Sequence, residues 1–113
     1  MSDIPSEIRD ATLIVAPQTK MMDDEQLKAL STTIDKQAGA SSSGISLVVI
    51  DLSKVHLLPS LALGLLVQIS SKCKARQQKL KLAAVQPAVR QVFAITRLDR
   101  VFEFASTVDA AID

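Results

Sequence analysis

Short apolar runs alternate with segments of helical periodicity along this chain. Residues 11–16 read Ala-Thr-Leu-Ile-Val-Ala, and residues 45–52 read Ile-Ser-Leu-Val-Val-Ile-Asp-Leu. Runs of this length with many β-branched side chains are typical of buried strands. Residues 79–84, Lys-Leu-Lys-Leu-Ala-Ala, alternate polar and apolar side chains before they become apolar. These runs predict three strands, and residues 101–104 predict a short fourth one.

Between these runs the apolar residues recur at helical spacing. A first helix is predicted after Met22, where three acidic side chains suit a helix N-terminus, and it ends at the serine-rich segment 39–44, a predicted loop. A second helix is predicted over residues 61–77, a third begins at Pro87, and a final turn runs through Ala111. Strands alternating with helices predict an α/β fold, a mixed sheet of four to five strands packed with about four helices.

The composition indicates a folded chain without a strong charge. Its 113 residues are 48% hydrophobic and 22% charged, so we expect a single domain over residues 1–113. The 13 basic and 12 acidic residues leave a formal net charge of +1, which gives no global attraction to nucleic acid or to an anionic membrane. The aromatic residues are three phenylalanines, too few for stacking against single-stranded bases. We therefore expect no nucleic-acid partner.

Three further observations predict a cytoplasmic protein. Cys73 is the only cysteine, so it can form neither an intrachain disulfide nor a structural zinc site, and a reducing compartment is expected. The N-terminus lacks the basic start and the apolar run of a secretory signal. The longest apolar stretch, residues 57–67, is interrupted by Pro59 and Ser60 and is shorter than the roughly 20 residues of a membrane span. No membrane span is predicted.

Residues that could support catalysis are sparse. His56 is the only histidine and lies between two apolar residues, which is typical of a structural or surface histidine. Gly39 and Gly44 flank serines and lack the Gly-Lys-Ser/Thr ending of a phosphate-binding loop. We expect no catalytic residue, no cofactor and no bound metal, and hence no enzyme.

The helix that begins near Ser60 carries more information than the rest of the chain. A rotation of about 100° per residue places a core stripe on one face. This stripe consists of Ala62, Leu65, Leu66, Ile69 and Cys73. The same rotation gathers Ser60, Leu63, Gly64, Val67 and Ser71 on the opposite face. A helix that is apolar on both sides must be covered twice, by its own domain or by a second molecule, and the small size of the chain favours the second molecule.

Ser60 is predicted to cap this helix. Its hydroxyl would accept hydrogen bonds from backbone N–H groups of the first turn. A phosphate on that oxygen would add about −1.5 to −2 charges at a place where the helix dipole favours an anion, so the fold would persist. The same charge beside Leu63 and Val67 would have to be desolvated when a partner covers them. Modification of Ser60 would therefore prevent binding without unfolding the domain.

At these residues the sequence resembles the STAS family, which includes bacterial anti-sigma-factor antagonists and cytoplasmic domains of sulphate transporters. The resemblance extends over nearly the whole chain, and four blocks carry it. These are Leu47 to Val55 (Leu-Val-Val-Ile-Asp-Leu-Ser-Lys-Val), Leu57 to Gly64 (Leu-Leu-Pro-Ser-Leu-Ala-Leu-Gly), Lys81 to Phe93 (Lys-Leu-Ala-Ala-Val-Gln-Pro-Ala-Val-Arg-Gln-Val-Phe) and Ile95 to Phe102 (Ile-Thr-Arg-Leu-Asp-Arg-Val-Phe). The serine that is phosphorylated in the family corresponds to Ser60, and Pro59 stands where the family usually has Asp. Arg97 stands at a glycine of the family, where a left-handed residue ends the third helix.

The resemblance implies a non-enzymatic switch of the anti-sigma-factor antagonist type. The partners that it implies are an anti-sigma factor that is also a serine kinase, and a phosphatase that removes the phosphate. The expected binding residues lie at the start of the second helix and are Pro59, Ser60, Leu61, Leu63, Gly64 and Val67. The same outer side would also allow a homodimer.

Two alternatives remain open. The chain could be a scaffold subunit of a signalling assembly that is never phosphorylated. It could also be a small-ligand-binding or transport-associated component of the same fold, which an apolar cavity beneath the second helix would favour.

Overall fold

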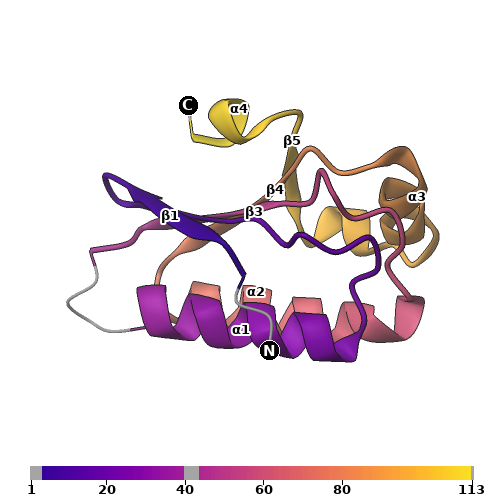
Figure 1. Ribbon diagram of the computed structural model, residues 1–113, viewed down its shortest axis with the longest axis horizontal. Coiled ribbons are helices and arrows are strands. Elements are labelled where there is room, and N and C mark those ends of the chain that lie inside the picture. Colours follow the sequence, from indigo (N-terminus) through magenta and orange to yellow (C-terminus); the bar gives the residue numbers. More distant parts are fainter. Residues whose placement is uncertain (1–3, 40–43, 113) are drawn as a thin grey trace.

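The computed structural model describes residues 4–39 and 44–112, except for the side chain of Leu61. After an initial hairpin, strands and helices alternate along the chain (Figure 1). The elements are β1 (Ser6–Arg9), β2 (Thr12–Val15), α1 (Asp24–Ala38), β3 (Leu47–Asp51), the 3₁₀ helix η1 (Ser60–Ala62), α2 (Leu63–Ala75), β4 (Lys79–Ala83), α3 (Pro87–Ile95), the 3₁₀ helix η2 (Leu98–Arg100), β5 (Glu103–Ala105) and α4 (Val108–Ile112). Most of the predicted serine-rich loop, residues 40–43, lies outside the described residues.

The described strands form one sheet in the order β1-β2-β3-β4-β5, in which β1 is antiparallel to β2 and the other neighbours are parallel. The predicted mixed α/β fold is therefore confirmed, and β1 is the strand that the sequence pattern did not predict. All four residues of β1 are exposed, and Ile8 is its one apolar residue. An edge strand with so little apolar surface lacks the pattern by which buried strands are predicted.

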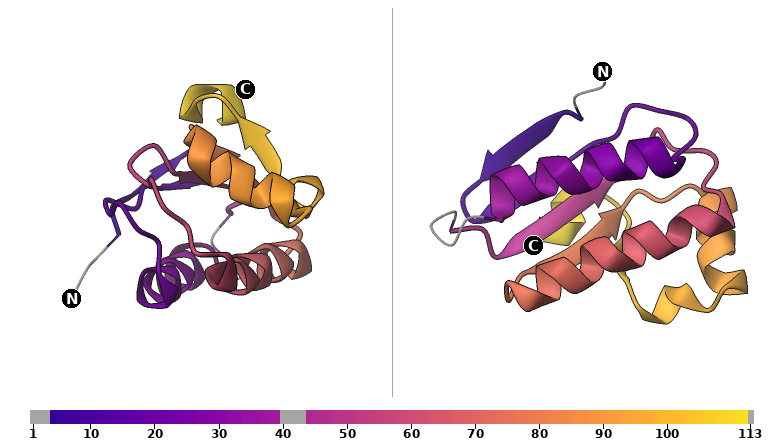
Figure 2. Two further views of the ribbon diagram at one scale, coloured as in Figure 1. Left: turned by 90° about the vertical axis from the view of Figure 1, so that its right-hand side faces the viewer. Right: turned by 90° about the horizontal axis from the view of Figure 1, so that it is seen from below.

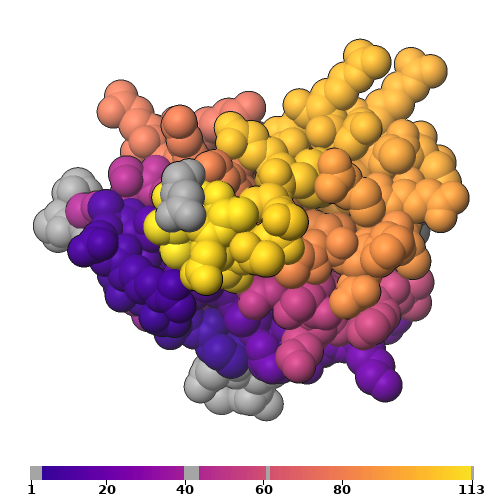
Figure 3. Space-filling model, turned by 90° about the horizontal axis from the view of Figure 1, so that it is seen from above, coloured from indigo at the N-terminus to yellow at the C-terminus, as the bar shows by residue number. Residues whose placement is uncertain are grey.

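Helices cover the two faces of the sheet unequally. Helices α1 and α2 lie side by side across one face, and the short α4 lies on the other (Figures 1 and 2). The main core fills the space between the sheet and the helix pair, and all four residues of β2 are buried. A smaller apolar cluster, which includes Ile14 and Val49, packs against Ala111 of α4. Figure 3 shows this C-terminal segment lying over the middle of the second face.

Helix α1 begins at Asp24, within the acidic segment that predicted its start. The carboxylate of Asp23 accepts a hydrogen bond of 2.9 Å from the backbone N–H of Gln26 and so caps the first turn. Further along α1, the Asp35 carboxylate accepts hydrogen bonds from Lys72 of α2 and from Arg76, which directly follows that helix. These charged contacts hold the two helices together at the end away from Ser60.

The carboxyl ends of the parallel strands bring three loops to one end of the molecule. Because β2, β3 and β4 are parallel, the segments that follow them leave the sheet in the same direction and lead into α1, α2 and α3. These loops and α3 lie together at the right of Figure 1. In open sheets with parallel strands, this end commonly carries the binding site.

Candidate functional site

The loop that leads from β3 to Ser60 is firmly held. Val55 and Leu58 are buried in the core and fix the loop at two points. The side-chain amide of Gln86, which precedes α3, donates a hydrogen bond of 2.7 Å to the carbonyl of Ser53. The carboxylate of Asp51 accepts a hydrogen bond of 2.9 Å from the backbone N–H of Ser53. The loop that leads into Ser60 therefore has a path that is set by packing and hydrogen bonds.

A second loop pairs with this one through its backbone. The carbonyl of Lys20 accepts hydrogen bonds from the N–H groups of His56 (2.7 Å) and Leu57 (2.9 Å), and the Leu57 carbonyl accepts one from Met22 (3.0 Å). Met21 and Leu57 are thereby paired in a parallel bridge. Their side chains are 42% and 55% exposed, although both are large and apolar.

This pair of apolar side chains was not predicted as part of the site. Each residue belongs to a different loop, and no periodic pattern connects them in the sequence. Leu57 lies shortly before Ser60 in the chain, and Met21 is held beside Leu57 by the bridge between the two loops. Exposed apolar side chains that are held in a fixed arrangement are a common feature of contact surfaces.

Ser60 is exposed and is the first residue of η1. The prediction that its hydroxyl caps the helix is wrong: Pro59 takes the cap position with an extended backbone (φ −60°, ψ 138°), and no side chain caps η1 or α2. The turn closes instead through backbone bonds, from the N–H of Ala62 to the Pro59 carbonyl and from that of Leu63 to the Ser60 carbonyl. The hydroxyl is therefore not needed for the helix to form.

The faces of α2 agree only in part with the predicted ones. On the predicted core face, Ala62, Leu66, Ile69 and Cys73 are buried and Leu65 is partly exposed. On the predicted outer face, Ser60, Gly64 and Ser71 are exposed, Val67 is partly buried and packs against the core, and Leu63 is buried. The placement of Leu63 on the outer side is wrong, because only 2% of it is accessible.

The reason lies in the neighbours of α2. On the flank that carries Ser70, which is buried, the helix borders a small hollow shared with Val101 and Glu103. Leu63 and Ser70 are seven residues apart and therefore lie on the same side of α2, so the buried arc of the helix extends to this flank. What α2 presents outward is the small or polar set of Ser60, Gly64, Gln68 and Ser71. The outer side is thus less apolar than predicted.

The other residues that the sequence pattern singles out differ in exposure. Pro59 is partly exposed, and the side chain of Leu61 lies outside the described residues. His56 is exposed on the loop before η1. Cys73 is fully buried on the core side of α2, and burial raises the pKa of its thiol, which keeps it protonated and unreactive at neutral pH.

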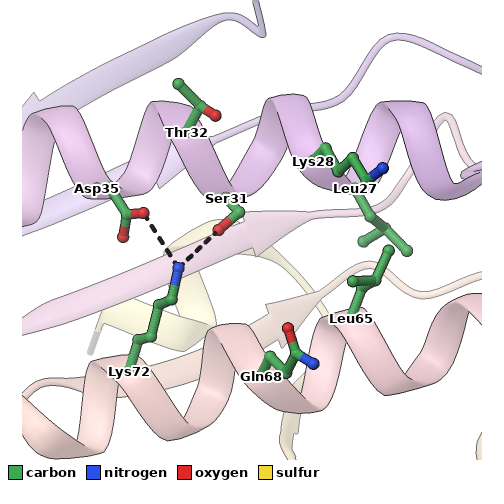
Figure 4. A pocket seen from close by; sticks show the side chains of 8 residues that line it. All are labelled: Leu27, Lys28, Ser31, Thr32, Asp35, Leu65, Gln68 and Lys72. Carbon is green, nitrogen blue, oxygen red and sulfur yellow. Dashed lines mark hydrogen bonds and ion pairs between the residues drawn. The ribbon is translucent and has the colours of Figure 1, made fainter.

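A groove of about 460 Å³ runs between α1 and α2 on their outer side (Figure 4). Leu27 and Leu65 face one another at one end, and Lys72 reaches Ser31 and Asp35 at the other. The remaining lining residues are Lys28, Thr32 and Gln68. This groove is open and is lined by polar as well as apolar side chains, so it does not provide the apolar cavity beneath the helix that a small-ligand function would require.

Comparison with known proteins finds one matching protein family and several similar solved structures. The family profile of the STAS domain matches residues 3–111. A putative anti-sigma factor antagonist from Thermotoga maritima has a similar structure, with a TM-score of 0.82, 21% identity and coverage of 96% of this chain and 91% of that one. An anti-sigma factor antagonist from Mycobacterium paratuberculosis gives a TM-score of 0.79 at 28% identity, covering 96% and 89%.

A third similar structure is that of the anti-sigma factor antagonist SpoIIAA in its unphosphorylated form. Its TM-score is 0.74 at 17% identity, and the match covers 97% of this chain and 93% of that one. Within the residues that the structure describes, no helix has the length and apolar character needed to cross a membrane.

Proposed function

The chain belongs to the STAS-domain family, and from this premise we propose that it is a regulatory protein of the anti-sigma-factor antagonist type. In this proposal it binds an anti-sigma factor that is also a serine kinase. The partner contacts the end of the molecule where Met21, Leu57 and Ser60 lie, together with Pro59 and Gly64. Phosphorylation of Ser60 ends the complex, and a phosphatase restores it.

The observation that carries the proposal is the exposed hydroxyl of Ser60 in the first helical turn behind a fixed loop. A kinase can reach this hydroxyl without unfolding the chain. Because the hydroxyl takes no part in capping the helix, a phosphate there would remove no stabilising contact. The first N–H groups of a helix have no intrahelical partners, and the dipole favours an anion beside them.

The switch would act through desolvation. Met21 and Leu57 provide the apolar contact in place of the buried Leu63, and a partner that covers them would also enclose the start of α2. A doubly charged phosphate within such a contact loses its hydration, which costs more binding free energy than an apolar contact of this size provides. Only a partner that supplied compensating cations would tolerate it.

Incubation with ATP and the anti-sigma kinase encoded nearest to this protein tests the proposal. We expect the intact mass to rise by one phosphoryl group in the wild-type chain and in Ser71→Ala, which removes an exposed hydroxyl further along α2. Ser60→Ala should stay unmodified. A Ser60→Ala chain that still gains the phosphoryl group would contradict the assignment of the switch to this residue.

The scaffold alternative makes a different prediction. Size-exclusion chromatography with light scattering should find the unmodified chain as a monomer or dimer that gains mass only with the kinase. A large assembly of this chain alone would favour the scaffold function instead.

A further inference from the structure

Helix α3 presents a large aliphatic side chain to solvent. Val89 and Phe93 anchor the helix from below, and the ring of Phe93 packs edge-on against Phe102 (5.4 Å between centroids) and Phe104 (5.5 Å). Ile95 follows Phe93 by two positions, about 200° around the helix, and therefore points away from the core. Its side chain is 73% exposed even though the helix beneath it is firmly packed.

The chain turns sharply at the next residues through a strained conformation. Arg97 has a left-handed backbone (φ 63°, ψ 18°), and its N–H donates to the carbonyl of Ala94. Glycine is the usual residue at such a helix end, because a β-carbon makes this conformation unfavourable. Gln77 adopts a similar conformation at the end of α2, so strain alone does not distinguish Arg97. What distinguishes Arg97 is that exposed aliphatic and basic residues lie on either side of it in the chain.

Two arginines and two aliphatic residues, all of them exposed, lie close together in the chain between the end of α3 and the end of η2. We call Ile95, Arg97, Arg100 and Val101 the arginine corner. Both arginines are exposed, and neither forms an ion pair with any residue of the described chain. Val101 is 39% exposed and lines a hollow of about 130 Å³, whose rim carries Lys74 and Lys79.

The charge around the arginine corner is unbalanced. Arg97, Arg100, Lys74 and Lys79 are basic, whereas Asp99 and Glu103 are acidic, so four positive charges face two negative ones. Guanidinium groups bind carboxylates in a bidentate geometry and are weakly hydrated, which suits them to protein interfaces. The three phenylalanines of the chain are buried or partly buried, so no aromatic side chain is available here to anchor the surface in a membrane interface, and a segment of a partner protein is the better fit.

We propose that the arginine corner is a second docking site, which binds an acidic segment of a partner protein. Aspartate or glutamate side chains of that segment pair with Arg97 and Arg100, and an aliphatic side chain packs against Ile95 and Val101. The elements that build this site differ from those around Ser60. The proposal therefore stands independently of phosphorylation at that residue.

Nuclear magnetic resonance with a defined probe tests this inference. The isotope-labelled full chain is titrated with a short peptide of glutamates around one leucine, and with a counterpart in which glutamine replaces each glutamate. We expect the acidic peptide to shift the amide signals of residues 95–101 and to bind more tightly than the neutral peptide, by a factor of about five or greater. This difference in affinity should fall as salt is added. Equal shifts from both peptides, or no shift at these amides, would overturn the proposal.

Matched glycine variants separate binding from strain. Arg97→Gly removes the guanidinium and the backbone strain together, so it should raise Tm by a few degrees while weakening the acidic peptide about fivefold. Gln77→Gly relieves the same kind of strain outside the arginine corner and should leave peptide binding unchanged. Wild-type affinity in Arg97→Gly, with Arg100→Gln also unaffected, would refute the assignment.

One further variant tests whether this site is independent of Ser60, and two further measurements test for other occupants of the surface. Ser60→Asp should bind the peptide as the wild type does, whatever becomes of the proposed switch. Shifts of the same amides on raising the concentration of the chain alone would assign the surface to a second copy. Preferential binding to vesicles of anionic lipid would assign it to a membrane. Either of the last two results would overturn the proposal.

Discussion

The backbone of Met21 pairs with that of Leu57 in a parallel bridge, and both apolar side chains remain exposed. The bridge joins the loop before α1 to the loop before η1, so an apolar pair from distant parts of the sequence is held in a fixed place. In the proposed function, this pair provides the apolar contact that the sequence pattern had placed on the outer face of α2. The contact surface of the proposed switch is therefore formed by the strand-to-helix loops as well as by the helix itself.

Leu57→Glu tests whether this pair binds the partner. The charge would have to be desolvated in the complex, so we expect affinity for the anti-sigma kinase to fall by about tenfold or more. Because the side chain is 55% exposed, the free energy of unfolding should change by about 0.5 kcal/mol or less. Isothermal titration and urea unfolding measure the two effects. Ile8→Glu, at a residue of similar exposure (52%) on β1, serves as the control and should bind normally.

Ser60→Asp places a permanent charge at the start of η1. We expect partner affinity to fall by about tenfold or more, while Ser60→Ala retains it, because only the carboxylate must lose its hydration. Stability should change by about 0.5 kcal/mol or less, since no cap is lost and the helix dipole favours the charge. Equal affinity of the two variants in a titration would refute the proposed switch.

Leu63→Ala and Gly64→Ala test the corrected orientation of α2. Leu63 is buried, so its truncation should lower the free energy of unfolding by about 2–5 kcal/mol. Gly64 is exposed, and a β-carbon there would meet no atom within 4 Å, so alanine should stabilise the helix by about 0.5–1 kcal/mol. Urea unfolding of both variants shows whether each substitution lowers or raises the free energy of unfolding. A harmless Leu63→Ala would restore the outward orientation that the sequence predicted.

Asp35 makes a pH-dependent contribution to stability. Burial opposes its ionisation, but hydrogen bonds from Arg76 and Lys72 outweigh burial and keep the pKa of Asp35 below its usual value. The unfolded chain therefore binds this proton more readily, so the stabilisation is present above pH of about 4 and is lost as pH falls through the folded pKa.

Asp35→Asn should accordingly destabilise the chain by about 1 kcal/mol or less at pH 7, because the carboxylate is partly exposed. The difference from wild type should shrink toward pH 3 in urea unfolding curves. Asp99→Asn, at an exposed carboxylate without an ion pair in the described chain, should show no such convergence. A constant difference at both pH values would contradict this explanation.

Periodicity predicted the buried strands well and the edge strand not at all. Strands β2, β3 and β4 are covered on one or both faces, so their apolar runs record burial directly. Strand β1 pairs with β2 through its backbone and buries little apolar surface, so its residues show no apolar pattern. For the same reason the sequence predicts only part of the proposed site: Ser60 lies at a helix start that a local pattern predicts, whereas Met21 lies in a loop.

The sequence by itself determined the alternation of strands and helices, the capped start of α1 at Asp23, and the location of Ser60 at the beginning of a helix. Each of these depends on interactions between residues close together in the chain, which leave a local pattern. The tertiary structure alone decided that Leu63 is covered and that Met21 meets Leu57. Helical spacing fixes how residues are arranged around α2, but only the segments packed against that helix decide which side of it faces solvent.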